Sequence, residues 1–142
     1  MKIIKKNSIL IFFSILLLFS IVSCSKKVNF LTSPVVPAAR GYVKVSNDKN
    51  KNYVVQIHLQ DLAEVQRLQP SKQTYIVWMI TDHDISKNIG QIKSSASHMS
   101  RQLKANFETV SSVKPTKIFI TAEDDPSVQF PGTQVVLSTD NF

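Results

Sequence analysis

The chain has 142 residues, with 17 lysines and arginines against 10 acidic residues, giving a formal net charge of +7. The basic residues are scattered and form no stripe interleaved with stacking aromatic residues, which argues against a nucleic-acid-binding surface. Hydrophobic residues make up 43% of the chain and Cys24 is its single cysteine. This is the composition of a globular domain that packing alone must stabilise, because no disulfide can form within the chain.

The N-terminal stretch has the layout of a secretory signal peptide. Three lysines among the first six residues precede an apolar run over residues 9–22. A basic head followed by about 7–15 apolar residues is typical of such signals, and the run falls short of the roughly 20 residues that a membrane-spanning helix needs. We therefore expect residues 1–23 to be removed. The remaining 119 residues are enough for one domain, and with those three lysines gone their net charge is +4.

The end of the apolar run contains a candidate cleavage site for such a signal. Leu18-Phe19-Ser20-Ile21-Val22-Ser23-Cys24 resembles the lipobox of bacterial lipoprotein signals, in which branched apolar residues and a small residue precede cysteine. The resemblance implies cleavage before Cys24, transfer of a diacylglyceryl group to its thiol, and acylation of the freed amine by a fatty acid such as palmitate. Two or more acyl chains give stable anchoring. The alternative is an uncleaved helix with a stray cysteine.

A lipidated Cys24 predicts a place in the cell envelope, with the lipid bilayer as one partner. Ser25 after the cysteine is compatible with sorting to the outer membrane, on its periplasmic or its surface side, by the rule known in enteric bacteria. Residues 24–39 contain prolines and little periodicity. We interpret them as an extended, lipidated tether, with a first strand through residues 28–31 as the alternative.

From Arg40 onward, several segments have apolar residues at every second position, which is the pattern of half-buried strands. Residues 62–68 have the spacing of a short helical turn that Pro70 ends, and Gly90 predicts a bulge. Residues 73–81 are apolar on both faces and predict a central strand, with Trp78 packed between two sheets. Polar, Pro-rich or Gly-rich loops are expected at 94–102 and 123–132. The expected strands cover residues 40–46, 53–60, 73–81, 88–93, 103–108, 117–122 and 133–138.

Seven short strands separated by turn residues favour an all-β fold. We expect a single Ig-like antiparallel β-sandwich over residues 40–142, with a small barrel as the alternative.

The second half of the chain has a further resemblance. Tyr75-Ile76-Val77-Trp78, Ile89-Gly90-Gln91-Ile92, Lys117–Glu123 and the closing Pro131–Leu137 segment are similar to the extracytoplasmic C-terminal domain of the anti-sigma-K factor family. The resemblance covers residues from about 53 to 140 and implies the fold and a part in sensing or interaction at the envelope. That family has a cytoplasmic sigma-binding domain and a membrane span before this module. The motifs quoted above include neither the sigma-binding domain nor the span, so no functional residue of that family is assigned to this chain.

Candidate sites for chemistry are few. Asp82-His83-Asp84 and Glu123-Asp124-Asp125 contain metal-ligand residue types, but the first has adjacent side chains that point in opposite directions, and the second lacks the spaced oxygen ligands of a calcium loop. The histidines, His58, His83 and His98, fall on three different expected elements, and no Gly-x-Ser-x-Gly elbow supports a hydrolase.

The sequence therefore predicts a lipid-anchored, non-enzymatic envelope module without cofactor, catalytic residue or metal site, which contacts an unknown envelope protein. The alternative is an envelope domain that binds a small ligand or calcium. A hydrolase is a third hypothesis.

Overall fold

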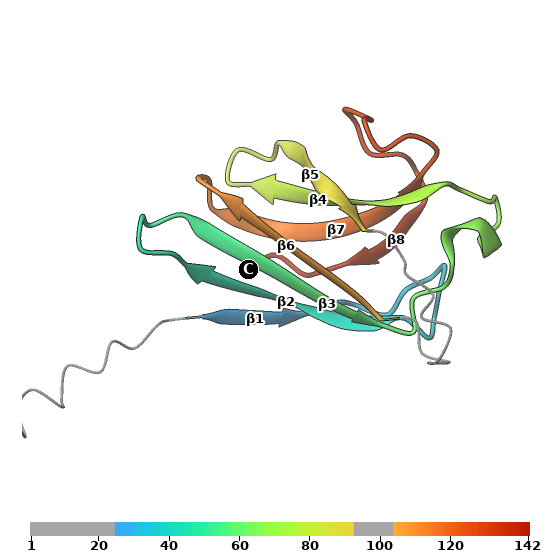
Figure 1. Ribbon diagram of the computed structural model, residues 1–142, viewed down its shortest axis with the longest axis horizontal. Coiled ribbons are helices and arrows are strands. Elements are labelled where there is room, and N and C mark those ends of the chain that lie inside the picture. Colours follow the sequence, from blue (N-terminus) through green and yellow to red (C-terminus); the bar gives the residue numbers. More distant parts are fainter. Residues whose placement is uncertain (1–24, 93–103) are drawn as a thin grey trace, which may run out of the picture.

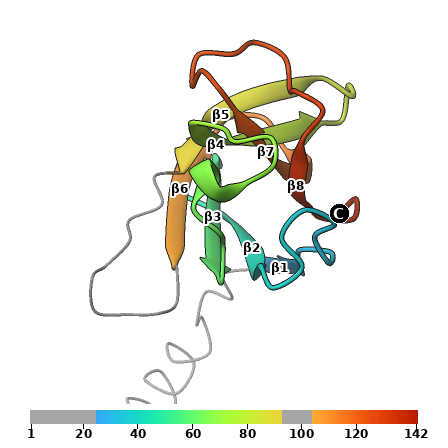
Figure 2. The same ribbon diagram turned by 90° about the vertical axis from the view of Figure 1, so that its right-hand side faces the viewer.

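The computed structural model describes residues 25–92 and 104–142, which form two four-stranded antiparallel sheets packed face to face (Figures 1 and 2). The first sheet has the strand order β1-β2-β3-β6 and the second has the order β5-β4-β7-β8. The expected all-β sandwich is confirmed, with eight strands in place of seven. The strands are β1 (Lys26–Asn29), β2 (Arg40–Asn47), β3 (Tyr53–Gln60), β4 (Thr74–Thr81), β5 (Ser86–Ile92), β6 (Ala105–Ser111), β7 (Pro115–Glu123) and β8 (Val135–Ser138).

The core between the sheets follows from the alternation in the sequence. Every second residue of β3, β4 and β7 points toward the facing sheet and is buried, as the two-residue period of a strand requires. Each such side chain contributes roughly 1.5–3 kcal/mol on full burial. The inward set of these three strands is Val55, Ile57, Leu59, Tyr75, Val77, Met79, Ile118, Ile120 and Ala122.

The connection from β3 to β4 carries the expected helical turn, a 3-10 helix, η1 (Val65–Arg67). Leu62, Val65 and Leu68 are all buried and join the inter-sheet core. Their spacing of three places them on one side of the turn, since a 3-10 helix has three residues per turn. The segment closes the end of the sandwich opposite the β2–β3 turn (Figure 1).

The tether expected for residues 24–39 is wrong for the described part of that segment. Lys26–Asn29 forms β1 and pairs with β2, so the alternative of a first strand is correct, although that strand begins two residues before the expected 28–31. Phe30 then forms a bridge with Thr139, directly after β8. The hydroxyl of Ser33 then donates a hydrogen bond to the carbonyl of Val136. The segment therefore joins the two sheets along one side, and the domain begins at Lys26 instead of Arg40.

Trp78 is fully buried, but its expected position between the sheets is wrong. It lies with Ile76 and Phe119 on the outer face of the second sheet, in a separate apolar cluster. Its ring stacks on Phe119 with centroids 6.2 Å apart. The loop after β7, which contributes Val128 to the cluster, arches over this face (Figure 2). The prediction that both faces of β4 are covered is thus correct, but the outer face is covered by the loop after β7 and not by a second sheet.

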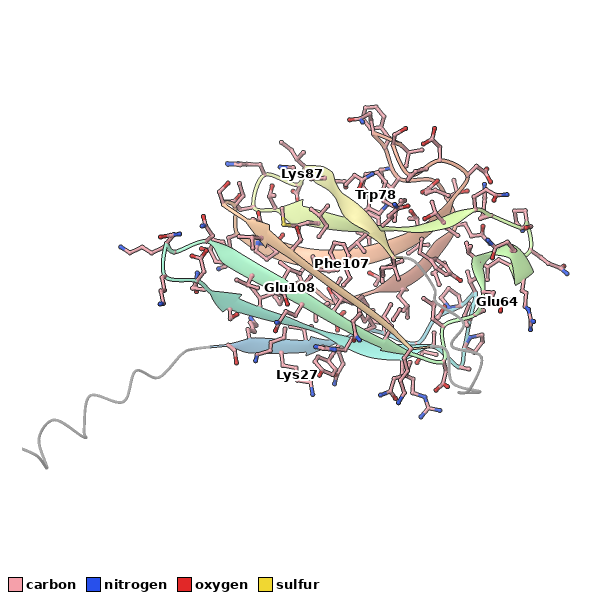
Figure 3. All side chains as sticks on the ribbon, viewed as in Figure 1. Lys27, Glu64, Trp78, Lys87, Phe107 and Glu108 are labelled. Carbon is pink, nitrogen blue, oxygen red and sulfur yellow. The ribbon has the colours of Figure 1, made fainter. Side chains whose placement is uncertain are left out.

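The expected bulge at Gly90 is confirmed. The register of β4 against β5 shifts after Val77, which pairs with Gly90, while Trp78 pairs with Asn88. Gly90 has φ of 139° and lies against the ring of Phe107, where an added Cβ would come within 2.8 Å of the ring. Figure 3 shows Phe107 between the two layers. Glycine is therefore required at this position.

The loop expected at 94–102 and the first residue of the strand expected at 103–108 lie outside the described residues. Within the described ranges, no helix has the length and hydropathy that crossing a bilayer requires.

Candidate functional site

The outer face of the first sheet carries a row of polar and aromatic side chains across three strands. Tyr42 of β2 pairs with His58 of β3, and His58 pairs with Asn106 of β6. The three residues alternate with inward-facing neighbours, so their side chains lie on the solvent side of the sheet. Side chains directly opposite on neighbouring strands are close enough to interact.

This row is held together by specific contacts. The rings of Tyr42 and His58 lie with centroids 4.9 Å apart. His58 Nδ1 is 2.8 Å from Asn106 Oδ1, a hydrogen bond in which the ring nitrogen donates. On the other side of the row, the Lys27 ammonium lies 3.8 Å from the centroid of the Tyr42 ring, a cation–π contact. We call Lys27, Tyr42, His58 and Asn106 the aromatic row.

A groove of about 540 Å³ runs beside the aromatic row. Phe30 and Leu31 of the connection after β1 line one side, and Arg40 and Gln60 extend the lining past His58. Leu31 is 48% exposed. The groove thus combines an accessible apolar side chain, an arginine and three aromatic rings, those of Phe30, Tyr42 and His58.

Next to the aromatic row runs a second row of outward side chains. Lys44 pairs with Gln56, and Gln56 pairs with Glu108. Gln56 Nε2 donates a hydrogen bond of 2.8 Å to Glu108 Oε2. This face can therefore offer amide and carboxylate groups on β3 and β6, and positive charge on β1 and β2.

This surface was not predicted from the sequence. Tyr42 and His58 fall within two expected strands, and His58 was considered only as one of three separate histidines. The strands of residues 40–46 and 53–60 meet at one short turn, so an antiparallel pairing was inferable. The match between Tyr42 and His58 then follows from the turn length, which fixes the register. Asn106 could not be added from the sequence, because β6 is far from β3 along the chain.

Asp82-His83-Asp84 forms the expected exposed turn after β4. His83 Nε2 lies 3.7 Å from Asp82 Oδ1, and both side chains are largely exposed. Asp84 has a positive φ of 56°, a conformation that aspartate tolerates better than most residues. The three side chains do not converge on one point.

Glu123-Asp124-Asp125 separates into three carboxylates with different partners. Glu123, 6% exposed, accepts hydrogen bonds from the Thr121 hydroxyl at 2.5 Å and from the Gly132 N–H at 2.7 Å. Asp124 pairs with Lys72 Nζ at 2.6 Å. Asp125 accepts from the N–H and the hydroxyl of Ser127, and these bonds lower its pKa. Across residues 25–92 and 104–142, no three metal-ligating side chains gather at one point.

The remaining candidates are spread over the molecule. His58 lies on β3 of the first sheet and His83 in the β4–β5 turn of the second, and in the described part of the chain neither ring is hydrogen-bonded to a serine hydroxyl. His98 and Cys24 lie outside the described residues. Trp78 has no exposed surface and cannot stack on a ligand in this conformation.

The lipobox at Cys24 and the similarity to the anti-sigma-K factor module are the two likenesses that the sequence offers. Both stay predictions. Comparison of the chain with models of protein families, with curated proteins and with solved structures finds no match.

Proposed function

We propose that this chain is a bacterial lipoprotein of the cell envelope, anchored through acylated Cys24, whose sandwich domain binds another envelope protein and performs no catalysis. The anchor part of the proposal rests on the lipobox-like stretch that ends at Cys24. The binding part rests on the outer face of the first sheet. We propose the outer membrane as the site of anchoring, since Ser25 follows the cysteine.

The observation that supports the binding part is the difference between the two outer faces of the sandwich. The second sheet carries its apolar cluster under the loop after β7. On the first sheet, the outward side chains are exposed or half-buried. Figure 3 shows Lys27 pointing away from the second sheet. An accessible face with a groove beside it is where a partner can reach the sandwich.

The residue types on this face are those of protein–protein interfaces. Tyrosine and arginine are enriched at such interfaces and at their energetic hot spots, and Tyr42 and Arg40 both line the groove. The contacts of Tyr42 with His58 and Lys27 fix its ring before a partner arrives. Less side-chain entropy is then lost on binding.

Site-directed photo-crosslinking in intact cells tests this proposal. A photoreactive residue at Gln56, beside the aromatic row, should give a discrete cross-linked protein adduct. The matched control is Gln129, an exposed glutamine in the loop over the second sheet. We expect the Gln56 adduct to disappear in a Tyr42→Ala, His58→Ala background, and no adduct from Gln129. Equal adducts from both positions, or an adduct from Gln129 alone, would overturn the choice of face.

A further inference from the structure

If Cys24 carries the lipid, the strand pairing determines which end of the sandwich lies nearest the bilayer. This step rests on the function proposed above. Lys26 is already in β1, paired with Val45. Two residues of extended chain reach at most about 7 Å. The acyl chains are therefore attached close to the end at which β1 begins.

Several loops come together at that end. The β2–β3 turn follows Asn47, and Tyr53 pairs with Ser111 just before the β6–β7 turn. A hollow of about 200 Å³ is lined jointly by Lys26, Asn47, Tyr53, Lys114 and Phe142. The start of β1, residues 48–52, residues 112–114 and Phe142 are hereafter the anchor end. In Figure 1, the start of β1 and both turns lie on the left.

The anchor end is positively charged. Lys26, Lys49, Lys51 and Lys114 are all exposed. Asp48 is the acidic residue of the two turns, and its carboxylate is occupied by hydrogen bonds from Asn50 and Asn52 within its own turn.

The β4–β5 turn projects in the same direction and carries Asp82 and Asp84. It belongs to the second sheet, whereas β1 lies at the far edge of the first. The attachment point and the positively charged β2–β3 turn therefore lie on the first sheet, the β6–β7 turn with Lys114 connects the two sheets, and the acidic turn lies on the second sheet.

An apolar side chain accompanies the charges. Val113, at the tip of the β6–β7 turn and next to Lys114, is 41% exposed. Lysines that attract anionic headgroups, with an apolar residue at the acyl boundary, are the combination by which proteins bind a membrane surface.

We propose that the anchor end lies against an anionic bilayer surface, with the lysines of the β2–β3 and β6–β7 turns contacting lipid phosphates and Val113 at the headgroup boundary. In this orientation the long axis of the sandwich extends outward from the membrane surface. The loop after β7, in which Phe130 is 84% exposed, lies at the opposite end of the sandwich, away from the bilayer (Figure 1). The groove beside the aromatic row faces sideways and stays accessible.

Fluorescence quenching on the lipidated mature protein, residues 24–142, tests this orientation. Cys24 is the single cysteine and its sulfur is occupied by the lipid, so a fluorophore attaches only to the introduced thiol of a Val113→Cys or a Phe130→Cys variant. The proteins are reconstituted in phosphatidylglycerol vesicles that contain a headgroup-linked quencher. We expect quenching at position 113 to be several-fold stronger than at position 130. Equal quenching, or stronger quenching at position 130, would overturn the proposal.

Charge reversal tests whether the lysines of the anchor end contribute to this orientation. Lys49→Glu with Lys114→Glu should reduce quenching of a probe at position 113. The matched control, Arg67→Glu with Lys104→Glu, reverses two exposed charges outside the anchor end and should leave it unchanged. An identical effect of the two pairs would contradict a specific role of the anchor end.

The intact mass of each preparation keeps the two proposals apart. An acylated protein whose probes are quenched equally contradicts the orientation and leaves the anchor intact. A protein without acyl groups contradicts the anchor itself.

Discussion

Glu123 accepts a hydrogen bond of 2.7 Å from the backbone N–H of Gly132, and this contact fastens the loop between them over Trp78. The same carboxylate accepts a hydrogen bond from the hydroxyl of Thr121. That hydroxyl in turn accepts a hydrogen bond of 2.8 Å from Trp78 Nε1–H. The outer cover of the second sheet therefore depends on one buried carboxylate.

Glu123→Ala should lower the free energy of unfolding by about 2–3 kcal/mol, because the buried Thr121 hydroxyl and the half-buried Gly132 N–H lose their acceptor. Trp78 is the single tryptophan, so urea denaturation followed by its fluorescence reports the change. Its emission should also shift to longer wavelength before global unfolding. Asp124→Ala is the control, since that exposed carboxylate forms only a surface ion pair with Lys72, worth about 0–1 kcal/mol. Equal losses in the two variants would show that Glu123 does not fasten the loop.

Gly132→Ala tests the same contact from the other side. A Cβ at this position would lie 2.7 Å from Glu123 Oε2, so we expect a loss of about 1–3 kcal/mol from overpacking. In the Glu123→Ala background the cost should shrink, because the space is vacant. A double-mutant cycle from urea midpoints measures this coupling. Additive losses would mean that the two residues do not interact.

Because of Tyr75, we expect the domain to lose stability in strong base. Its ring is fully buried and its hydroxyl donates a 2.9 Å hydrogen bond to the Ala63 carbonyl. Burial raises the pKa of Tyr75 to about 12 from 10.0, because desolvation penalises the phenolate. The folded-state pKa is raised, so this contribution to stability is fully present below pH 10 and is lost as the pH rises from 10 to about 12.

Tyr75→Phe should therefore be less stable near neutral pH, by about 1 kcal/mol for the lost hydrogen bond, and should lose less stability above pH 10 than the wild type does. Urea midpoints at a series of pH values, compared between the two proteins, measure the difference. Parallel curves would contradict a raised pKa.

Because of Asp48, we expect a smaller loss of stability in acid. Hydrogen bonds from the Asn52 side chain, the Asn52 N–H and the Asn50 N–H lower the pKa of Asp48 below its ordinary 3.8. The folded-state pKa is depressed, so the contribution is present above pH 3.8 and is lost as the pH falls through the folded-state value. Asp48→Ala should thus lose less stability than the wild type between pH 5 and pH 2, because it lacks the carboxylate whose pKa is lowered in the folded state. Melting temperatures of the two proteins, measured across that pH range, test this prediction, and parallel curves would contradict it.

Most of the fold was predictable because the inter-sheet core repeats every second residue. β3 shows it most clearly, with Val55, Ile57 and Leu59 facing inward as expected. The central strand β4 was predicted from its apolar residues on both faces. What could not be predicted is which element covers the outer face of the second sheet, since the loop of residues 124–134 is held there by Glu123 and not by apolar periodicity.

The first strand was expected only as the alternative to a tether, for a related reason. β1 is an edge strand in which Val28 is half-buried between exposed neighbours, so its pattern is weak. Its continuation at Phe30 and Ser33 is held by β8, more than 100 residues later. Such long-range hydrogen bonds leave no local signal. The aromatic row was hidden likewise, because Asn106 joins Tyr42 and His58 only through the pairing of β3 with β6.

The central claim is that Cys24 anchors the sandwich to the membrane. The most direct test is the intact mass of the protein extracted from membranes, compared with that of a Cys24→Ala variant. We predict a wild-type mass equal to residues 24–142 plus a diacylglyceryl group and an amide-linked fatty acid, and loss of the acyl mass in the variant. An unmodified full-length wild-type mass would contradict the anchor and would leave residues 9–22 attached as an apolar N-terminal segment.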